Sequence, residues 1–195
     1  MRADAERSTA RILEAAATVL ADDPNASLER VADVAGLARA TVHRRFASRK
    51  ALVEALTVQL NERYLQGLKQ ARVDTAPPIV ALHRLTETVF ELKVTHRFAM
   101  NATADPVTLC PSLSPEVVAG LQLLFTRMHD AGLITAAGPA WCCRVYLALL
   151  SEVDQLPAGA PDLAGVDDDQ GARVDLLVRS VIGALGGQGL ATLRT

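Results

Sequence analysis

Positive charge gathers in one short stretch of the sequence, between residues 39 and 50. The stretch holds five cations and one histidine but no acid. A guanidinium can donate two parallel hydrogen bonds to the O6 and N7 atoms of guanine, and any of these cations can pair with a phosphate. This composition suits binding to a polyanion, and to double-stranded DNA in particular. The five cations are Arg39, Arg44, Arg45, Arg49 and Lys50.

The spacing of the apolar residues predicts which way these side chains point. Val42 and Phe46 are four residues apart, so on a helix over about residues 38–46 they share an inward face. At about 100° per residue, Arg44 then points directly outward. Arg39 stands in the first turn, the end that usually enters the major groove. We therefore expect Arg39 and Arg44 to read bases.

Other residues of the same region are expected to contact DNA without reading its sequence. Ala40 also points outward and has almost no side chain, so it lets the backbone approach the DNA. Thr41 and His43 on the flanks, and Ser27 further upstream, can bond to phosphate oxygens. The alternative is an ordinary solvated basic face. The residues expected to add salt-dependent phosphate contacts are Arg45, Arg49 and Lys50.

Two short helices joined by a glycine must position this stretch. Ser27 is a predicted cap for a helix with apolar residues at three- and four-residue steps, and Gly36 ends that helix. The basic helix follows after one tight turn, which is typical of a helix-turn-helix. A helix over about residues 6–20 precedes the pair. Ser48 caps a longer helix that runs to about Arg72 and connects the pair to the rest of the chain.

Residues 8–60 resemble the DNA-binding region of the tetracycline-repressor (TetR) family. The resemblance rests on residues 27–32, 35–37, 41–46 and 48–52. The family commonly has Ser or Thr where this chain has Ala38, and Tyr where it has His43. It commonly has His or Tyr in place of Arg45 and an acidic residue in place of Lys50. These departures predict a recognition helix without a side-chain cap and a DNA face that is more cationic than usual.

The resemblance implies a division of labour along the chain. Residues 1–50 would form the DNA-binding domain, and residues 51–195 a helical domain that binds a small-molecule effector and dimerises. The bound effector would move the two DNA-reading heads apart and release the operator. A homodimer also suits DNA geometry, because recognition helices about 34 Å apart can read the two halves of a palindromic operator.

Apolar periodicity predicts helices, and no strand, in the rest of the chain. The fold is therefore expected to be all-α, with about nine helices. Prolines and glycines predict loops over residues 101–115 and 156–169. An effector that acts on the DNA-binding domain should touch the connecting helix. The helices predicted after that one cover about residues 79–97, 117–131, 139–151 and 171–185.

Large side chains within these helices are candidates for an effector pocket, with plain core packing as the alternative for each. Two helices are apolar around most of their circumference, which a dimer interface would explain. The pocket candidates are Phe90, His96, Met100, Phe125, Met128 and Trp141. The interface candidates are Trp141, Val145, Leu149, Val174, Val178, Val181 and Ile182.

No metal, cofactor or catalytic site is predicted. His83, Glu87 and Glu91 stand at four-residue steps and could hold a metal, but a solvated or salt-linked face is favoured. No Ser/His/Asp set, phosphate loop or metal triad supports the rival interpretation of a small helical enzyme. A second rival is a DNA-binding dimer without a ligand. The three cysteines, expected to be core thiols rather than redox sensors, are Cys110, Cys142 and Cys143.

Composition agrees with a helical regulator. The 195 residues carry a net charge of −2. Residues 1–50 hold nine cations and seven acids, whereas residues 51–195 hold eleven and fifteen, so positive charge gathers in the first quarter of the chain. Neither a membrane-spanning stretch nor a secretion signal is recognisable, and a cytoplasmic location is expected.

Overall fold

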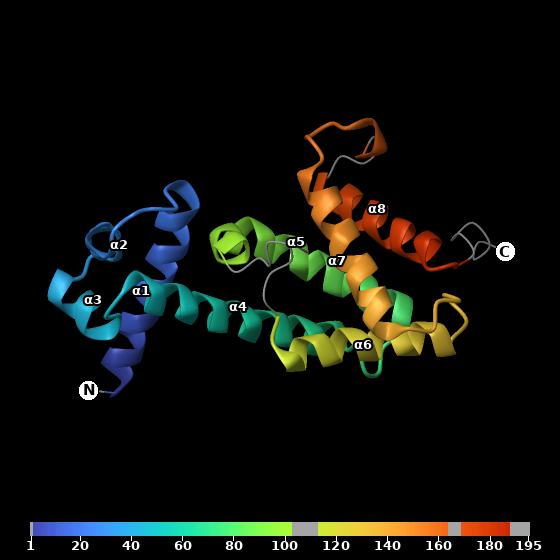
Figure 1. The fold of residues 1–195 in the computed structure, drawn as a ribbon, viewed down its shortest axis with the longest axis horizontal. Coiled ribbons are helices and arrows are strands. Elements are labelled where there is room, and N and C mark those ends of the chain that lie inside the picture. The colour runs from blue at the N-terminus through green and yellow to red at the C-terminus, as the bar shows by residue number, and fades with distance from the viewer. Residues whose placement is uncertain (1, 103–112, 164–168, 188–195) are drawn as a thin grey trace.

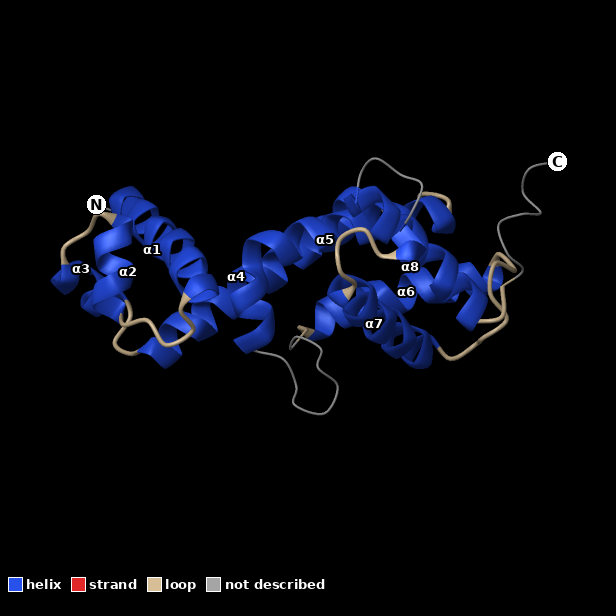
Figure 2. Ribbon diagram, turned by 90° about the horizontal axis from the view of Figure 1, so that it is seen from above, coloured by secondary structure: helices blue, strands red, loops and turns tan. Residues whose placement is uncertain are grey.

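The computed structural model of the protein describes residues 2–102, 113–163 and 169–187, with side chains described in all of these except residues 2–3 and 94–102. These parts are helical, without a strand, which confirms the predicted all-α fold (Figure 2). The elements are α1 (Arg2–Asp22), α2 (Leu28–Ala35), α3 (Arg39–Arg45), α4 (Arg49–Ala71), α5 (Pro78–Ala102), α6 (Pro115–Asp130), α7 (Pro139–Gln155), a 3₁₀ turn η1 (Pro161–Leu163) and α8 (Asp169–Ala184).

The first three helices form a small head at one end of the molecule (Figure 1). Its core is made by apolar side chains that face inward from each helix, with Ile12, Val31 and Val42 all fully buried. Helix α1 begins earlier than the predicted residue 6, because the residues before that position include good helix formers and no breaker.

Helix α4 leaves this head and runs along the C-terminal helices (Figure 1). The Ser48 hydroxyl accepts a hydrogen bond from the backbone N–H of Ala51, as expected of a capping serine. The helix ends where Arg72 adopts a left-handed conformation with φ of 54°. One stripe of α4 is buried along its whole length: Leu52, Leu56, Leu60, Tyr64 and Leu68.

Helices α5 and α6 pack against the far part of α4, and α7 and α8 lie against these two helices and each other (Figures 1 and 2). Helix α5 packs against α4, α6 and α8, and it also touches α1, while α7 lies against both α6 and α8. Helix α5 continues five residues past the predicted end at residue 97, because the next proline is Pro106. The rest of the loop predicted over residues 101–115 lies largely outside the described residues.

Two glycines bring α4 very close to its neighbours. A Cβ atom on Gly67 would lie 2.9 Å from Cγ2 of Thr88 on α5. A Cβ atom on Gly120 of α6 would lie 2.7 Å from Cδ1 of Leu68. Real Cβ atoms do not approach other atoms so closely, so a larger residue at either position would force the Thr88 or Leu68 side chain to shift.

Two of the three cysteines are buried within α7, and Cys110 lies outside the described residues. Burial, followed by the neighbouring Cys142, raises the pKa of the Cys143 thiol to about 11. A thiol with so high a pKa stays protonated near neutral pH, so this one behaves as a core residue.

Among the described helices, none is both long and apolar enough to cross a membrane.

Candidate nucleic-acid interface and effector cavity

The turn between α2 and α3 has the geometry that the sequence predicts. The Ser27 hydroxyl accepts a hydrogen bond from the N–H of Arg30, at 3.3 Å. Gly36 adopts φ of 61°, a left-handed conformation that suits glycine. Arg11 on α1 donates from Nη2 to the carbonyl of Ala35, at 2.7 Å. Arg11 therefore ties α1 to the end of α2, where the turn begins.

Helix α3 presents most of its side chains to solvent. Val42 is fully buried and Phe46 is 6% exposed, so both face inward as predicted. Ala38, at the N-cap position, makes no side-chain hydrogen bond to the helix. Thr41 is half-buried at the edge of the exposed face. The exposed residues on this helix are Arg39, Ala40, His43, Arg44 and Arg45.

Arg39 and Arg44 make no hydrogen bond or ion pair with any residue that the structure describes. Their guanidinium groups are solvated and available for an external partner. Because the two side chains lie on the exposed side of a helix anchored by Val42 and Phe46, their direction is fixed by the core. This is the arrangement that the sequence predicts for base-reading arginines.

His43, by contrast, already has a partner in the structure. Its Nε2 lies 3.0 Å from Oε1 of Glu29 on α2, and both side chains are about half exposed. The pKa of Glu29 falls from 4.5 to about 2, first because of the Ser27 hydroxyl, then its own backbone N–H, then His43. A carboxylate accepting these hydrogen bonds is stabilised in its charged form. Ser27 and His43 therefore both contact Glu29, which the sequence interpretation missed.

The three remaining cations lie in different surroundings. Arg49 donates from Nη2 to the carbonyl of Pro24, which ties the start of α4 to the loop after α1. Lys50 is exposed and lies 3.9 Å from Glu54, one turn along the same helix. Arg45 lines a shallow groove between α1 and α4. The side chain of Lys50 is 86% exposed.

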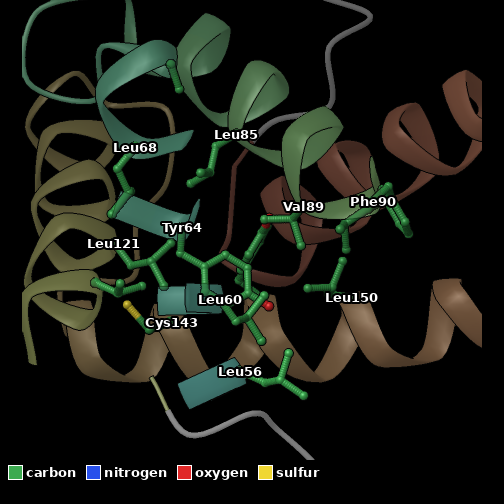
Figure 3. Packing of buried hydrophobic residues seen from close by; sticks show 14 of the residues in the cluster. Leu56, Leu60, Tyr64, Leu68, Leu85, Val89, Phe90, Leu121, Cys143 and Leu150 are labelled. Carbon is green, nitrogen blue, oxygen red and sulfur yellow. The ribbon is translucent and has the colours of Figure 1, made fainter. Parts of the chain in front are cut away.

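A narrow cavity lies among α4, α5, α6 and α7, with a volume of about 50 Å³. Figure 3 shows the packing there, with the ring of Tyr64 between Leu121 and Val89. Tyr64 belongs to the connecting helix, so the cavity touches α4 as expected. The described residues that line it are Tyr64, Leu68, Leu85, Val89, Lys93, Leu113, Val117, Leu121, Tyr146, Leu147, Leu150 and Ser151.

The pocket candidates named from the sequence are not among these lining residues. Phe90 and Met128 are buried in the core. Phe125 is also buried and packs on Tyr146, with ring centroids 6.0 Å apart. Trp141 is 54% exposed at the surface of α7. The side chains of His96 and Met100 lie outside the described residues.

The interface candidates fall into two groups. The four on α8 are buried inside the single chain, because α8 packs against α5 and α7. They therefore serve the core of one protomer and leave no area for a second. The three on α7, Trp141, Val145 and Leu149, keep exposed surface. The four core residues are Val174, Val178, Val181 and Ile182.

The possible metal ligands on α5 form a salt-linked face. His83 lies 3.5 Å from Glu87 on its own helix and 3.2 Å from Asp175 on α8. No cluster with metal-binding geometry occurs among the residues that the structure describes. His83 therefore joins two helices, and the favoured interpretation from the sequence agrees with these contacts.

A basic, outward-facing second helix on a helix-turn-helix, joined by one long helix to a bundle with an internal cavity, defines the class of helix-turn-helix transcriptional regulators. Comparison with known proteins agrees. Residues 12–56 match the family of bacterial regulatory proteins called the tetR family. The chain is 28% identical over 156 residues to the HTH-type transcriptional repressor LfrR of Mycolicibacterium smegmatis, covering 74% of this chain and 76% of that protein.

Solved structures give the same result. The crystal structure of LfrR from Mycobacterium smegmatis in complex with proflavine is 26% identical, has a TM-score of 0.60 and is matched over 90% of this chain and 95% of its own. The regulator PfmR from Thermus thermophilus shares the fold at 22% identity and a TM-score of 0.62, over 87% of this chain and 97% of its own. The chain is thus similar to TetR-family proteins, and these similarities support a DNA-binding transcriptional regulator.

Proposed function

We propose that this protein is a cytoplasmic repressor that binds a palindromic operator as a homodimer and leaves it when a small molecule enters the cavity beside α4. The observation that carries this proposal is the continuity of α4. The same helix begins at the Ser48 cap beside the DNA-binding face and supplies Tyr64 and Leu68 to the wall of the cavity.

The size of the cavity supports a coupling between ligand binding in the cavity and DNA binding by the head. Cavities that hold drug-sized ligands usually measure about 300–1,000 Å³. The present volume of about 50 Å³ is smaller, so a ligand of that size must push the walls apart. One wall belongs to α4, which packs closely on α5 at Gly67 and on α6 at Gly120. A ligand would thus favour a different position of the head.

We propose that residues 1–50 are the DNA-binding unit and that its contacts divide into two sets. Arg39 and Arg44 read bases in the major groove, and Ala40 allows close approach. The contacts to phosphate come from Thr41, His43, Arg45, Arg49, Lys50 and Ser27. Since Ser27 and His43 both bond to Glu29, a phosphate contact by either requires a change in that local bonding.

The dimer interface proposed here is the outer side of α7. Trp141 is 54% exposed, an unusual position for so large an apolar side chain. Val145 and Leu149 are half-buried on the same helix. A second copy related by two-fold symmetry would cover this surface and place two recognition helices on one side of the assembly.

The experiment that tests this function is a binding assay with the DNA upstream of the protein's own gene. Fluorescence anisotropy with labelled duplex, competed by random duplex, should give a large preference for the upstream DNA at physiological salt. Addition of small molecules, proflavine included, should then identify one that releases the DNA. Equal affinity for upstream and random duplex would contradict the proposal.

The small volume of the cavity also favours a second candidate, a DNA-binding dimer without any ligand. Thermal shift measurements separate the two candidates. A ligand at about one hundred times its dissociation constant should stabilise the protein by about 2.7 kcal/mol. Absence of any stabilising ligand, together with intact operator binding, would support the second candidate.

A further inference from the structure

The polar side chains of the cavity other than its tyrosines lie together at one end. Lys93 lines the cavity from α5 and Ser151 lines it from α7. The Lys93 ammonium donates to Oδ2 of Asp154, at 2.8 Å, and Asp154 lies one turn beyond Ser151 on the same helix. Lys93 is therefore anchored about one helix turn from Ser151. The side chain of Lys93 is only 18% exposed.

The described lining residues of the cavity include one positive charge, that of Lys93. No Asp or Glu occurs among the described lining residues. Asp154 neutralises Lys93 from outside the lining, but an ammonium has three N–H donors and Asp154 takes one of them. Burial raises the pKa of Tyr146 to about 12, so this phenol stays neutral. The donors left over at this end of the cavity suit an acceptor with negative charge.

The rest of the cavity is an apolar channel that leads to this charged end. Leu85, Val89 and Lys93 follow one another at four-residue steps along α5, a path of about 12 Å at 1.5 Å per residue. Leucine and valine side chains from α6 and α7 face them. A molecule that fits has an apolar body about two helix turns long, with its polar group at one tip.

We propose that the effector is an amphiphilic carboxylate, whose acid group accepts hydrogen bonds from Lys93 and Ser151 and whose apolar body lies along Leu85 and Val89. This inference rests on the proposed function only in taking the cavity as the effector site. It sets the protein apart from LfrR, whose crystal structure holds proflavine, an aromatic cation at neutral pH. A cation here would meet the Lys93 ammonium, and no carboxylate occurs among the described lining residues to bind it directly.

The test compares three molecules with the same chain and different head groups: decanoate, decanol and decylamine. Binding to the full-length protein is measured by isothermal titration calorimetry, below the concentrations at which these molecules form micelles. Decanoate should bind at least tenfold more tightly than decylamine, with decanol between them. A reversed order, or equal affinity for all three, would overturn the proposal.

Variants identify the residue responsible. Lys93→Gln should lower decanoate affinity about tenfold and leave decanol affinity unchanged. Asp154→Asn removes the internal partner of Lys93 and should raise decanoate affinity several-fold. Lys69→Gln, at an exposed lysine outside the lining, is the matched control and should behave as the wild type. Unchanged decanoate affinity in Lys93→Gln would overturn the assignment, and circular dichroism verifies that each variant is folded.

The same samples separate this inference from the proposed function. If decanoate binds in a manner that depends on Lys93 but does not release operator DNA, the carboxylate site is supported and the ligand-released repressor is contradicted. If decylamine releases the DNA and decanoate does not, the repressor is supported and the carboxylate site is contradicted. Lys93-dependent release by decanoate supports both.

Discussion

At the scale of single residues, Arg44 is the side chain best placed to read a base. It is exposed on α3, roughly opposite the buried Val42, and pairs with no described residue. We expect Arg44→Ala to weaken operator binding by about 1–3 kcal/mol and to relax the preference at one base pair, because a bidentate contact to guanine would be lost. Anisotropy titrations with single-base operator variants measure both effects.

The control for that prediction follows from the surroundings of the other cations. Arg49 binds the carbonyl of Pro24, so its removal would also loosen the head. Lys50 is a cleaner choice because Glu54, at 3.9 Å, is its exposed partner. Lys50→Ala should weaken operator and random duplex about equally and reduce the salt dependence. A loss of the same size on both duplexes for Arg44→Ala would contradict its role in base readout.

Glu29 predicts a dependence of stability on pH. Its pKa in the folded chain is about 2, below the ordinary value of 4.5, so its contribution is fully present above about pH 4.5 and is lost as the pH falls towards 2. Glu29→Gln should therefore be less stable than the wild type at neutral pH, and the difference should narrow through that acidic range. Urea denaturation at a series of pH values measures it, and a difference that stays constant with pH would contradict the assignment.

Sequence reasoning identified the residues whose roles are local. The Ser27 cap, the Gly36 turn and the inward Val42 each follow from neighbours within a few positions. The contact of His43 with Glu29 joins residues 14 apart, and that of Arg11 with Ala35 joins residues 24 apart. Such pairs depend on how whole helices pack, and no spacing rule for a single helix reveals them.

At the scale of elements, the turn between α2 and α3 is the part most sensitive to a small change. Gly36 has φ of 61°, and a Cβ atom there would lie 3.2 Å from Nη2 of Arg11. Gly36→Ala should cost about 1–2 kcal/mol of stability for the left-handed conformation and should also weaken operator binding, because Arg11 must move. Thermal denaturation and anisotropy measure the two effects.

Gly132 provides a matched control for that variant. It has φ of 68°, so it carries a similar conformational cost, but nothing lies within 4 Å of a Cβ atom built on it. Gly132→Ala should lower stability by a similar amount and leave operator affinity unchanged. If both variants lose stability and neither loses operator affinity, Arg11 does not set the angle of the recognition helix.

The helices themselves were largely predictable, because each has a buried stripe and recognisable ends. The cavity was not. Its wall includes Leu85 and Leu121, ordinary core residues in any single-helix pattern, whereas the aromatic residues chosen as candidates proved to be core or surface. A cavity is space left between several helices, so its lining depends on their mutual positions and not on residue type.

At the scale of the whole molecule, assembly into a dimer makes a prediction for Trp141. If the outer side of α7 forms the interface, Trp141→Glu places a charge in an apolar contact and should raise the dimer dissociation constant at least tenfold. Analytical ultracentrifugation measures the dissociation. Leu123→Glu is the control, since Leu123 is 44% exposed and belongs to α6 instead of α7. Equal behaviour of the two variants would contradict an interface at α7.

Trp141 is also the only tryptophan of the chain, so the wild type reports on its own assembly. Fluorescence emission should shift to longer wavelength on dilution if the indole leaves an interface for water. An emission spectrum that does not change over the concentration range of dissociation would place Trp141 outside the contact.

Because α4 is one continuous helix, a small tilt at one end produces a larger displacement at the other. From Ser48 to Leu68 the helix spans about 30 Å at 1.5 Å per residue. If the cavity end acts as the pivot, a tilt of about 5° displaces the other end by roughly 2.5 Å, close to the length of a hydrogen bond. The recognition helices of a dimer would move by this amount on both sides of the symmetry axis. A rotation too small to disturb the core would thus change the spacing of the two recognition helices, so that they no longer match successive major grooves of the DNA.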